Sequence, residues 1–155
     1  MATPSPDSSD RAASPAGAGA PVGYSGTPLP RKLGVTDHHV VLLDRLPDGL
    51  DLGLPAGAHV VRRLRDGLDV TLTFHTRLAS LEKRLPAVFE HTVVAGMVWV
   101  CWPKQAAAKR LGLDTDLNEN PVRQLGLDLG WVDVKVAAID ETWSGLKFVR
   151  RLADR

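Results

Sequence analysis

Apolar runs of strand or helix length, separated by glycine, proline and polar residues, divide the chain from residue 23 onward into alternating elements. Val70, Leu72 and Phe74 alternate with threonines and a histidine, a pattern typical of a strand with one apolar face. The unbroken apolar run at 97–102 has the length of a strand covered on both faces. Further strands are predicted at 39–43, 58–64, 132–139 and 146–151.

Helical spacing of apolar residues follows the strand at 70–74. Leucines recur on one helical face from Leu78 onward, Thr76 is placed to cap this helix, and Gly96 is predicted to end it. Pro86 lies inside the pattern and is expected to kink or divide the helix, because proline removes a backbone donor.

Two further helices are predicted from capping residues. One begins at Asp116 or at Asn120, two starts that the sequence leaves open, and ends at Gly130. The other is a short helix of one or two turns that Thr27 caps and Gly34 stops.

The order of these elements predicts the fold class. Strand, helix, strand units at 69–101 and 97–139 are expected to cross over right-handedly and to place helices on the sheet faces. The link at 140–145 is too short for a parallel crossover, so the last two strands should be antiparallel. We therefore expect an α/β fold, a small three-layer, Rossmann-like mixed sheet that is mostly parallel with a C-terminal antiparallel strand pair.

Residues 1–22 differ in composition from the rest of the chain. Sixteen of these 22 residues are alanine, proline, serine or glycine, so the segment has too few large apolar side chains to offset its ordering entropy. The sequence predicts a disordered low-complexity tail at 1–22 and a single α/β domain at 23–155.

Charge and cysteine content exclude several classes of protein. With 19 basic and 18 acidic residues, the chain lacks the basic field of a nucleic-acid-binding protein. The single cysteine, Cys101, allows no intramolecular disulfide and is expected in the core, which fits the cytoplasm. The sequence shows no secretion signal and no membrane-spanning run. Its histidines show no ligand spacing, so no metal site is predicted. No cofactor is predicted either.

Candidate ligand-binding residues follow the predicted strands, because ligands of open α/β sheets bind beyond the carboxyl ends of parallel strands. A lysine, two indoles, two hydroxyls and a carboxylate come together there, a set able to hold an anionic or planar ligand. These residues are Lys104, Trp102, Trp143, Thr142, Ser144 and Glu141. Tyr24, Ser25 and Arg31 from the N-terminal segment are expected to fold over this rim.

Each of these residues also has a structural interpretation. Strand-end tryptophans plug the end of a sheet as often as they contact ligands, and lysines there are commonly solvated. Glu141 could orient His75 as an acid and base pair, but a surface carboxylate and a strand histidine without contact are the favoured interpretation. Because the sequence offers no clear nucleophile, metal set or acid and base pair, it does not decide whether the protein is an enzyme.

Three long segments carry a family resemblance. The segments at 23–34, 99–104 and 133–149 resemble an uncharacterised bacterial family, domain-of-unknown-function family 3052, over about residues 23–151. The resemblance implies no activity, substrate or catalytic residue, because that family has none established.

The second half of the chain is also weakly similar to Rossmann-like methyltransferases. Those enzymes hold S-adenosylmethionine over a glycine-rich turn after the first strand. Here residues 43–47 follow that strand without a Gly-x-Gly pattern and leave no room for a full crossover helix. This departure argues against methyl transfer.

The sequence therefore favours a cytosolic domain that binds a small anionic or planar molecule at the carboxyl ends of its strands. The alternative is a non-catalytic protein-interaction or regulatory module, with a protein partner or a homodimer.

Overall fold

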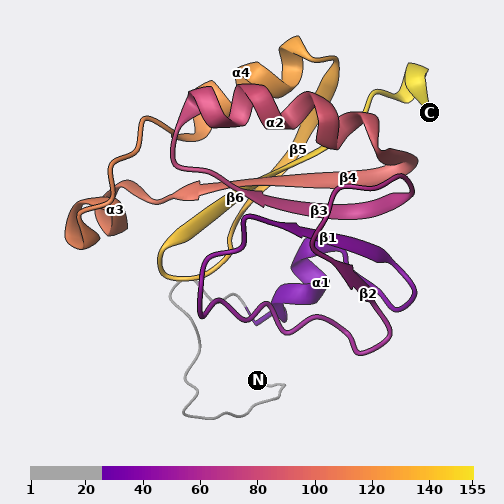
Figure 1. Cartoon of the computed structure of the whole chain (residues 1–155), viewed down its shortest axis with the longest axis horizontal. Helices are drawn as coiled ribbons and strands as arrows, with labels where there is room; N and C mark the ends of the chain where they lie inside the picture. The colour runs from indigo at the N-terminus through magenta and orange to yellow at the C-terminus, as the bar shows by residue number, and fades with distance from the viewer. Residues whose placement is uncertain (1–25) are drawn as a thin grey trace.

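The computed structural model describes residues 26–155 and contains one six-stranded sheet (Figure 1). Its strands are β1 (Val40–Asp44), β2 (His59–Val61), β3 (Leu68–Phe74), β4 (Thr92–Pro103), β5 (Trp131–Ala138) and β6 (Trp143–Arg150). The helices are α1 (Leu29–Leu33), α2 (Leu78–Glu90), α3 (Gln105–Leu111) and α4 (Glu119–Asp128), followed by a 3-10 turn, η1 (Leu152–Asp154). The predicted tail at 1–22 lies outside the described residues.

The strand order is β2-β1-β3-β4-β6-β5. β2, β1, β3 and β4 pair in parallel, whereas β6 is antiparallel to both β4 and β5. The predicted fold class is confirmed, including the antiparallel pair formed by β5 and β6. The sequence had not indicated that β6 inserts between β4 and β5.

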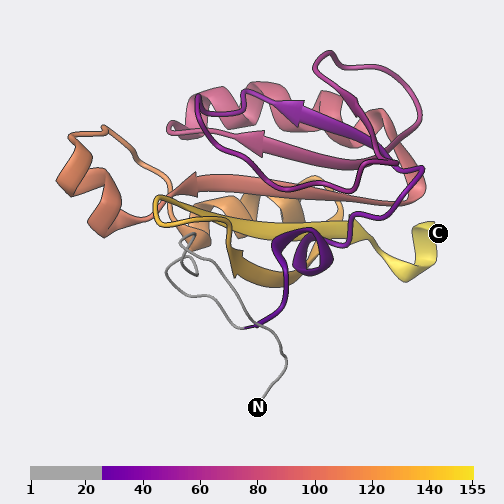
Figure 2. The ribbon, with the colours of Figure 1, turned by 90° about the horizontal axis from the view of Figure 1, so that it is seen from below.

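Helices and loops cover both faces of this sheet. α2 and α4 lie side by side on one face, while α1 and the connection from β1 to β2 lie on the other (Figures 1 and 2). Each face therefore has its own hydrophobic core, as expected when successive side chains of a strand point to opposite sides.

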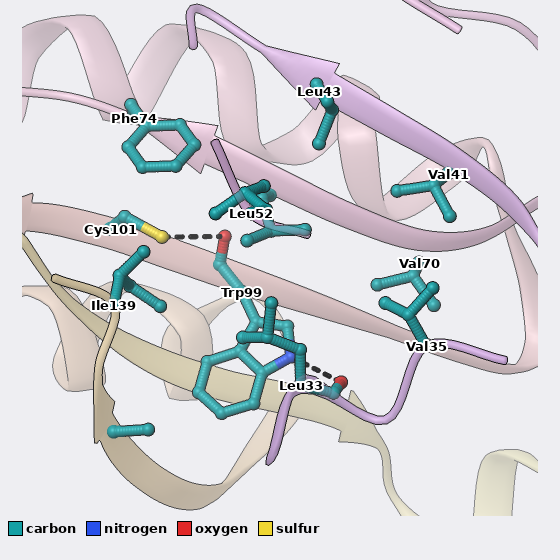
Figure 3. Close-up of a cluster of buried hydrophobic side chains, with 12 residues drawn as sticks. Leu33, Val35, Val41, Leu43, Leu52, Val70, Phe74, Trp99, Cys101 and Ile139 are labelled. Atoms are coloured by element: carbon teal, nitrogen blue, oxygen red, sulfur yellow. Dashed lines mark hydrogen bonds between the residues drawn. The ribbon is translucent and has the colours of Figure 1, made fainter. Parts of the chain in front are cut away.

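The core beneath α1 is built around Trp99 in the central strand β4 (Figure 3). Trp99 is fully buried, and its indole N–H donates to the carbonyl of Leu33 at 2.9 Å. This bond satisfies the polar end of a large apolar side chain and ties the segment before β1 to the middle of the sheet. Cys101 lies in the same core and is fully buried, as predicted.

The core beneath α2 and α4 contains a small aromatic cluster. Phe89 stacks on Trp131 with ring centroids 4.0 Å apart, and it meets Phe148 edge-on at 6.0 Å. Gly126 brings the backbone of α4 directly onto the Phe148 ring, so this helix packs closely against β6.

The boundaries of α2 and β4 differ from those predicted. α2 runs through Pro86 without division, because this proline is on the exposed side of the helix, where the unpaired carbonyl one turn before it can be hydrated. Gly96 does not end α2 but lies inside β4, next to an irregularity in its pairing with β3. A side chain there would crowd the Asp69 carbonyl, which explains the glycine.

The capping predictions also need correction. Thr76 does not cap α2; instead the Asp116 carboxylate accepts a hydrogen bond from the Leu78 N–H at 2.7 Å. α4 begins with Asn118 as its N-cap, which is neither of the two predicted starts. The short helix α3 was not predicted, and β2 is only three residues long.

We predict that Gly126→Ala destabilises the protein. Alanine normally stabilises a helix by about 1 kcal/mol relative to glycine, but here its Cβ would overlap the Phe148 ring. Overpacking of this kind costs about 1–3 kcal/mol. Urea denaturation should show the loss, while exposed Asp128→Ala on the same helix should leave stability nearly unchanged. A stabilised Gly126→Ala variant would contradict this packing.

Candidate functional site

The strand order has a topological switch point between β1 and β3. The chain leaves β1 toward β2 on one side, then returns to build β3 and β4 on the other. Ligands of open α/β sheets bind in the crevice at such a point, outside the carboxyl ends of the strands. Asp44 ends β1, and its partner in register is Thr73 near the end of β3.

Alternation along the two strands turns a set of polar side chains toward α2. Leu43 and Phe74 point to the core beneath α1, so Asp44, Thr73 and His75 face the other side. Asp44 is 4% exposed and His75 is 1% exposed. Polar atoms that are buried to this extent need hydrogen-bond partners. Two residues of α2 are among these partners.

These partners are Ser80 and Arg84, which lie one turn apart on α2. Ser80 Oγ lies 2.9 Å from His75 Nδ1, and His75 Nε2 lies 2.7 Å from Thr73 Oγ1. Thr73 Oγ1 in turn donates to Asp44 Oδ2 at 2.7 Å. One continuous hydrogen-bond chain therefore runs from the surface of α2 to the end of β1, through Ser80, His75, Thr73 and Asp44.

Arg84 forms a two-point ion pair with Asp44. Its Nη2 lies 2.8 Å from Oδ1 and its Nε lies 3.1 Å from Oδ2. Burial alone would raise the pKa of Asp44, but the hydrogen bonds from Arg84 and Thr73 and the charge of Arg84 lower it below its ordinary value. Asp44 is therefore a buried carboxylate that stays ionised.

His75 is held in its neutral form near pH 7. Burial first, and then the charge of Arg45, lower the pKa of His75 to about 4, although Asp44 opposes this shift. The imidazole therefore carries one ring proton at neutral pH and forms hydrogen bonds with two hydroxyls.

An open pocket of about 530 Å³ lies beside the hydrogen-bond chain. We name it the switch-point pocket; it is lined by Arg45, Ala79, Ser80, Lys83 and Arg84. Arg45, directly after β1, has a positive φ of 60°, a conformation that costs about 1 kcal/mol or more in a residue with a side chain. Three cationic side chains therefore converge on one concave surface, a composition suited to anions.

The rim residues predicted from the sequence lie in the turn from β5 to β6 and at the end of β4. Lys104 Nζ donates to the Asp140 carbonyl at 2.7 Å, and its backbone N–H donates to the Thr142 carbonyl. Asp140 Oδ1 accepts the N–H groups of Thr142 and Trp143. Lys104, Thr142 and Trp143 thus come together, and these bonds secure the turn.

The other members of the predicted set are dispersed. Trp102 packs beneath α2 and α4, whereas Trp143 meets Phe74 edge-on at 5.3 Å on the opposite face. Ser144 pairs with Trp102 in the sheet, and Glu141 is exposed.

The remaining predictions concern the N-terminal segment and the proposed acid and base pair. Arg31 is exposed on α1, while Tyr24 and Ser25 lie outside the described residues. His75 bonds Thr73 and Ser80, not Glu141. Ligand binding by the rim stays a prediction.

Sequence reasoning missed the switch-point pocket, although two signals for it were present. Asp44 ends the apolar run of β1, and Thr73 and His75 place polar groups on one face at the end of β3. What the sequence could not supply was the strand order that makes β1 and β3 neighbours.

Among residues 26–155, no group of three or more histidine, cysteine or acidic side chains is placed to bind a metal ion. Within the same residues, no helix is both long and apolar enough to cross a membrane.

No protein-family model and no curated protein matches this chain. Membership of the bacterial family that the sequence resembles therefore stays a prediction. Solved structures do match. LepI in complex with SAM, and a LepI variant in complex with SAH and a substrate analogue, each align with a TM-score of 0.50 and 13% identity. Each alignment covers 79% of this chain and 39% of LepI.

The fold is Rossmann-like. Magnesium protoporphyrin IX methyltransferase from Synechocystis with bound SAH also aligns, with a TM-score of 0.47 and 10% identity over 61% of this chain and 52% of the enzyme. The chain thus spans between 39% and 52% of the length of these structures. At 13% identity the likeness to LepI establishes the arrangement of strands and helices alone.

We predict an asymmetry between the two partners of the buried ion pair. Arg84→Met leaves the Asp44 carboxylate, whose side chain is 6% exposed, without its cation and should destabilise the protein by about 3 kcal/mol. Asp44→Asn should cost only about 1 kcal/mol, because Arg84 is 34% exposed and can turn to water. Urea denaturation of both variants measures the difference, and equal losses would contradict the ion pair.

We also predict that stability falls in acid through His75. Its pKa is about 4 in the folded protein and 6.5 unfolded, so the unfolded chain binds the extra proton as the pH drops between these values. The free energy of unfolding should therefore show no loss from His75 above pH 6.5 and should fall by about 3 kcal/mol toward pH 4. The lowered pKa of Asp44 acts in the same direction at still lower pH.

His75→Gln removes the titrating group, so its unfolding free energy should vary less between pH 6.5 and pH 4. Urea titrations at pH 7, 5.5 and 4.5 give the slope of the unfolding free energy against pH for each protein. This slope can be compared whatever the absolute stabilities of the two proteins. The same slope in both would show that His75 is not the group responsible.

Proposed function

We propose that this protein binds a small anionic molecule in the switch-point pocket, at the carboxyl ends of β1 and β3. The observation that carries the proposal is the convergence of Arg45, Lys83 and Arg84 on one concave surface at the switch point of the sheet. This proposal keeps the ligand class and the sheet edge expected from the sequence, and moves the site from the rim to the switch point.

The charges around the pocket support an anion over a neutral or cationic ligand. Arg84 uses Nε and Nη2 to hold Asp44, which leaves Nη1 to face a ligand. Arg45 and Lys83 are both exposed, and neither forms a salt bridge with the acidic side chains of residues 26–155. Asp44 offsets the charge of Arg84, which leaves Arg45 and Lys83 as the unpaired cations that line the pocket among the residues of 26–155.

The residues after β1 do not fit S-adenosylmethionine. The chain forms no glycine-rich turn there, and the connection at 45–58 lies on the sheet and packs Leu46, Leu50, Leu52 and Leu54 into the core beneath α1. Beyond the carboxyl end of β1 on that face, these leucines leave only a small pocket of about 190 Å³. We therefore do not extend methyl transfer to this chain.

Anion binding can be tested by isothermal titration calorimetry with inorganic phosphate, sulfate and citrate at low ionic strength. We expect saturable binding of at least one anion, weakened about tenfold by Lys83→Gln and by Arg45→Asn, since a charge-assisted hydrogen bond contributes roughly 1.5–3 kcal/mol. Asparagine is chosen at position 45 because it tolerates the positive φ.

Lys109→Gln, which removes an exposed lysine from α3, is the matched control and should bind as the unaltered protein does. Added sodium chloride should weaken binding through screening. The proposal fails if no anion binds, or if Lys109→Gln weakens binding as much as Lys83→Gln.

A further inference from the structure

We propose that the switch-point pocket selects an oxyanion that carries a proton, such as hydrogen phosphate, over one that carries none, such as sulfate. Ser80 is the residue that makes this selection. The inference rests on the proposed function, because it concerns an anion already attracted by Arg45, Lys83 and Arg84. Its basis is the direction of each hydrogen bond in the chain from Asp44 to Ser80.

The direction is set at the Asp44 end. An ionised carboxylate only accepts hydrogen bonds, and Arg84 holds Asp44 in that state. Thr73 therefore has to use its single hydroxyl proton on Asp44 Oδ2, at 2.7 Å. Toward His75, the Thr73 oxygen can then only accept.

The next step passes through the imidazole. His75 Nε2, 2.7 Å from Thr73 Oγ1, has to be the ring nitrogen that carries the proton. A neutral imidazole has one ring proton, so Nδ1 presents a lone pair to Ser80 at 2.9 Å. The low pKa of His75 agrees with this neutral form. Ser80 therefore donates its hydroxyl proton to Nδ1.

Ser80 is left with lone pairs alone for the pocket that it lines. A ligand oxygen that bears a proton can donate to these lone pairs, whereas a bare anionic oxygen at the same place is repelled. The carboxylate of Asp44, although buried and out of reach of the ligand, thus decides through three hydrogen bonds what Ser80 offers.

Charge alone predicts the opposite preference. Sulfate is a dianion at pH 7, and phosphate is a mixture of its monoanion and dianion, each of which keeps at least one proton. Three cationic side chains would therefore favour sulfate or bind both alike. Tighter binding of phosphate requires an acceptor in the site.

The test is a comparison of phosphate and sulfate affinities at pH 7 by isothermal titration calorimetry on the full chain. We expect phosphate to bind about tenfold more tightly than sulfate, the effect of one hydrogen bond gained and one repulsive contact avoided. In Ser80→Ala the ratio should fall to about one, because a methyl group neither accepts nor repels. Lys83→Gln should weaken both anions and keep the ratio.

Asp44→Asn provides a second, independent variant. Oδ2 of Asp44 accepts from both Thr73 and Arg84 Nε, so an amide nitrogen in its place donates to Thr73 and leaves the Arg84 Nε–H to water. Every bond along the chain from Thr73 to Ser80 can then reverse. Ser80 would then offer a proton to the pocket, so the preference should shift toward sulfate.

The outcomes separate this inference from the proposed function. Equal affinity for both anions, with both weakened by Lys83→Gln, would overturn the selection by Ser80 and leave anion binding intact. A phosphate preference that persists in Ser80→Ala would overturn it as well. Failure of both anions to bind would overturn the proposed function itself. If Asp44→Asn does not fold, the Ser80→Ala result decides alone.

Discussion

The need to stabilise one buried carboxylate organises the carboxyl end of this sheet. Asp44 ends an apolar strand and has almost no contact with water, so its charge has to be met by the protein. Arg84 meets it with two hydrogen bonds and Thr73 with a third. Because Arg84 is on α2, Asp44 on β1 and Thr73 on β3, satisfying this single group fixes the position of a helix over two parallel strands.

The same constraint extends from structure to chemistry. Once Asp44 can only accept hydrogen bonds, the proton positions of Thr73 and His75 are determined. Ser80 is then left with lone pairs toward the pocket. A site assembled in this way is preorganised, because its polar groups are held by partners in the protein before any ligand arrives. The strained backbone at Arg45 fits this interpretation, since such strain persists only where the surrounding structure enforces it.

Much of the fold could be predicted from the sequence, because local patterns reflect burial. The alternation from Val70 to Phe74 and the apolar run of β4 identified two neighbouring strands, and the short link before β6 identified its antiparallel direction. Errors arose where a distant residue decided a boundary. Asp116 caps α2 from 38 residues away, and Gly96 continues β4 because it lies against the Asp69 carbonyl.

Less of the candidate site could be predicted, for a related reason. The rule that ligands meet the carboxyl ends of parallel strands points to the same edge of the sheet as the proposed pocket, but it gave most weight to the ends of β4 and β5. Recognising the switch point requires the strand order, and the short β2 gives little sequence information about its place beside β1. Trp102 and Trp143 show the limit clearly, since adjacent strands carry them to opposite faces.

The connection after β1 differs from the one that commonly binds anions in such sheets. In dinucleotide-binding sheets a helix follows the first strand, and its N-terminal N–H groups receive phosphate. Here the connection packs leucines on the opposite face instead, and no helix begins there. The positive field at the switch point comes from side chains of Arg45 and α2. A field made by three side chains can be changed one residue at a time while the sheet stays intact, so the proposed anion binding is separable from the fold.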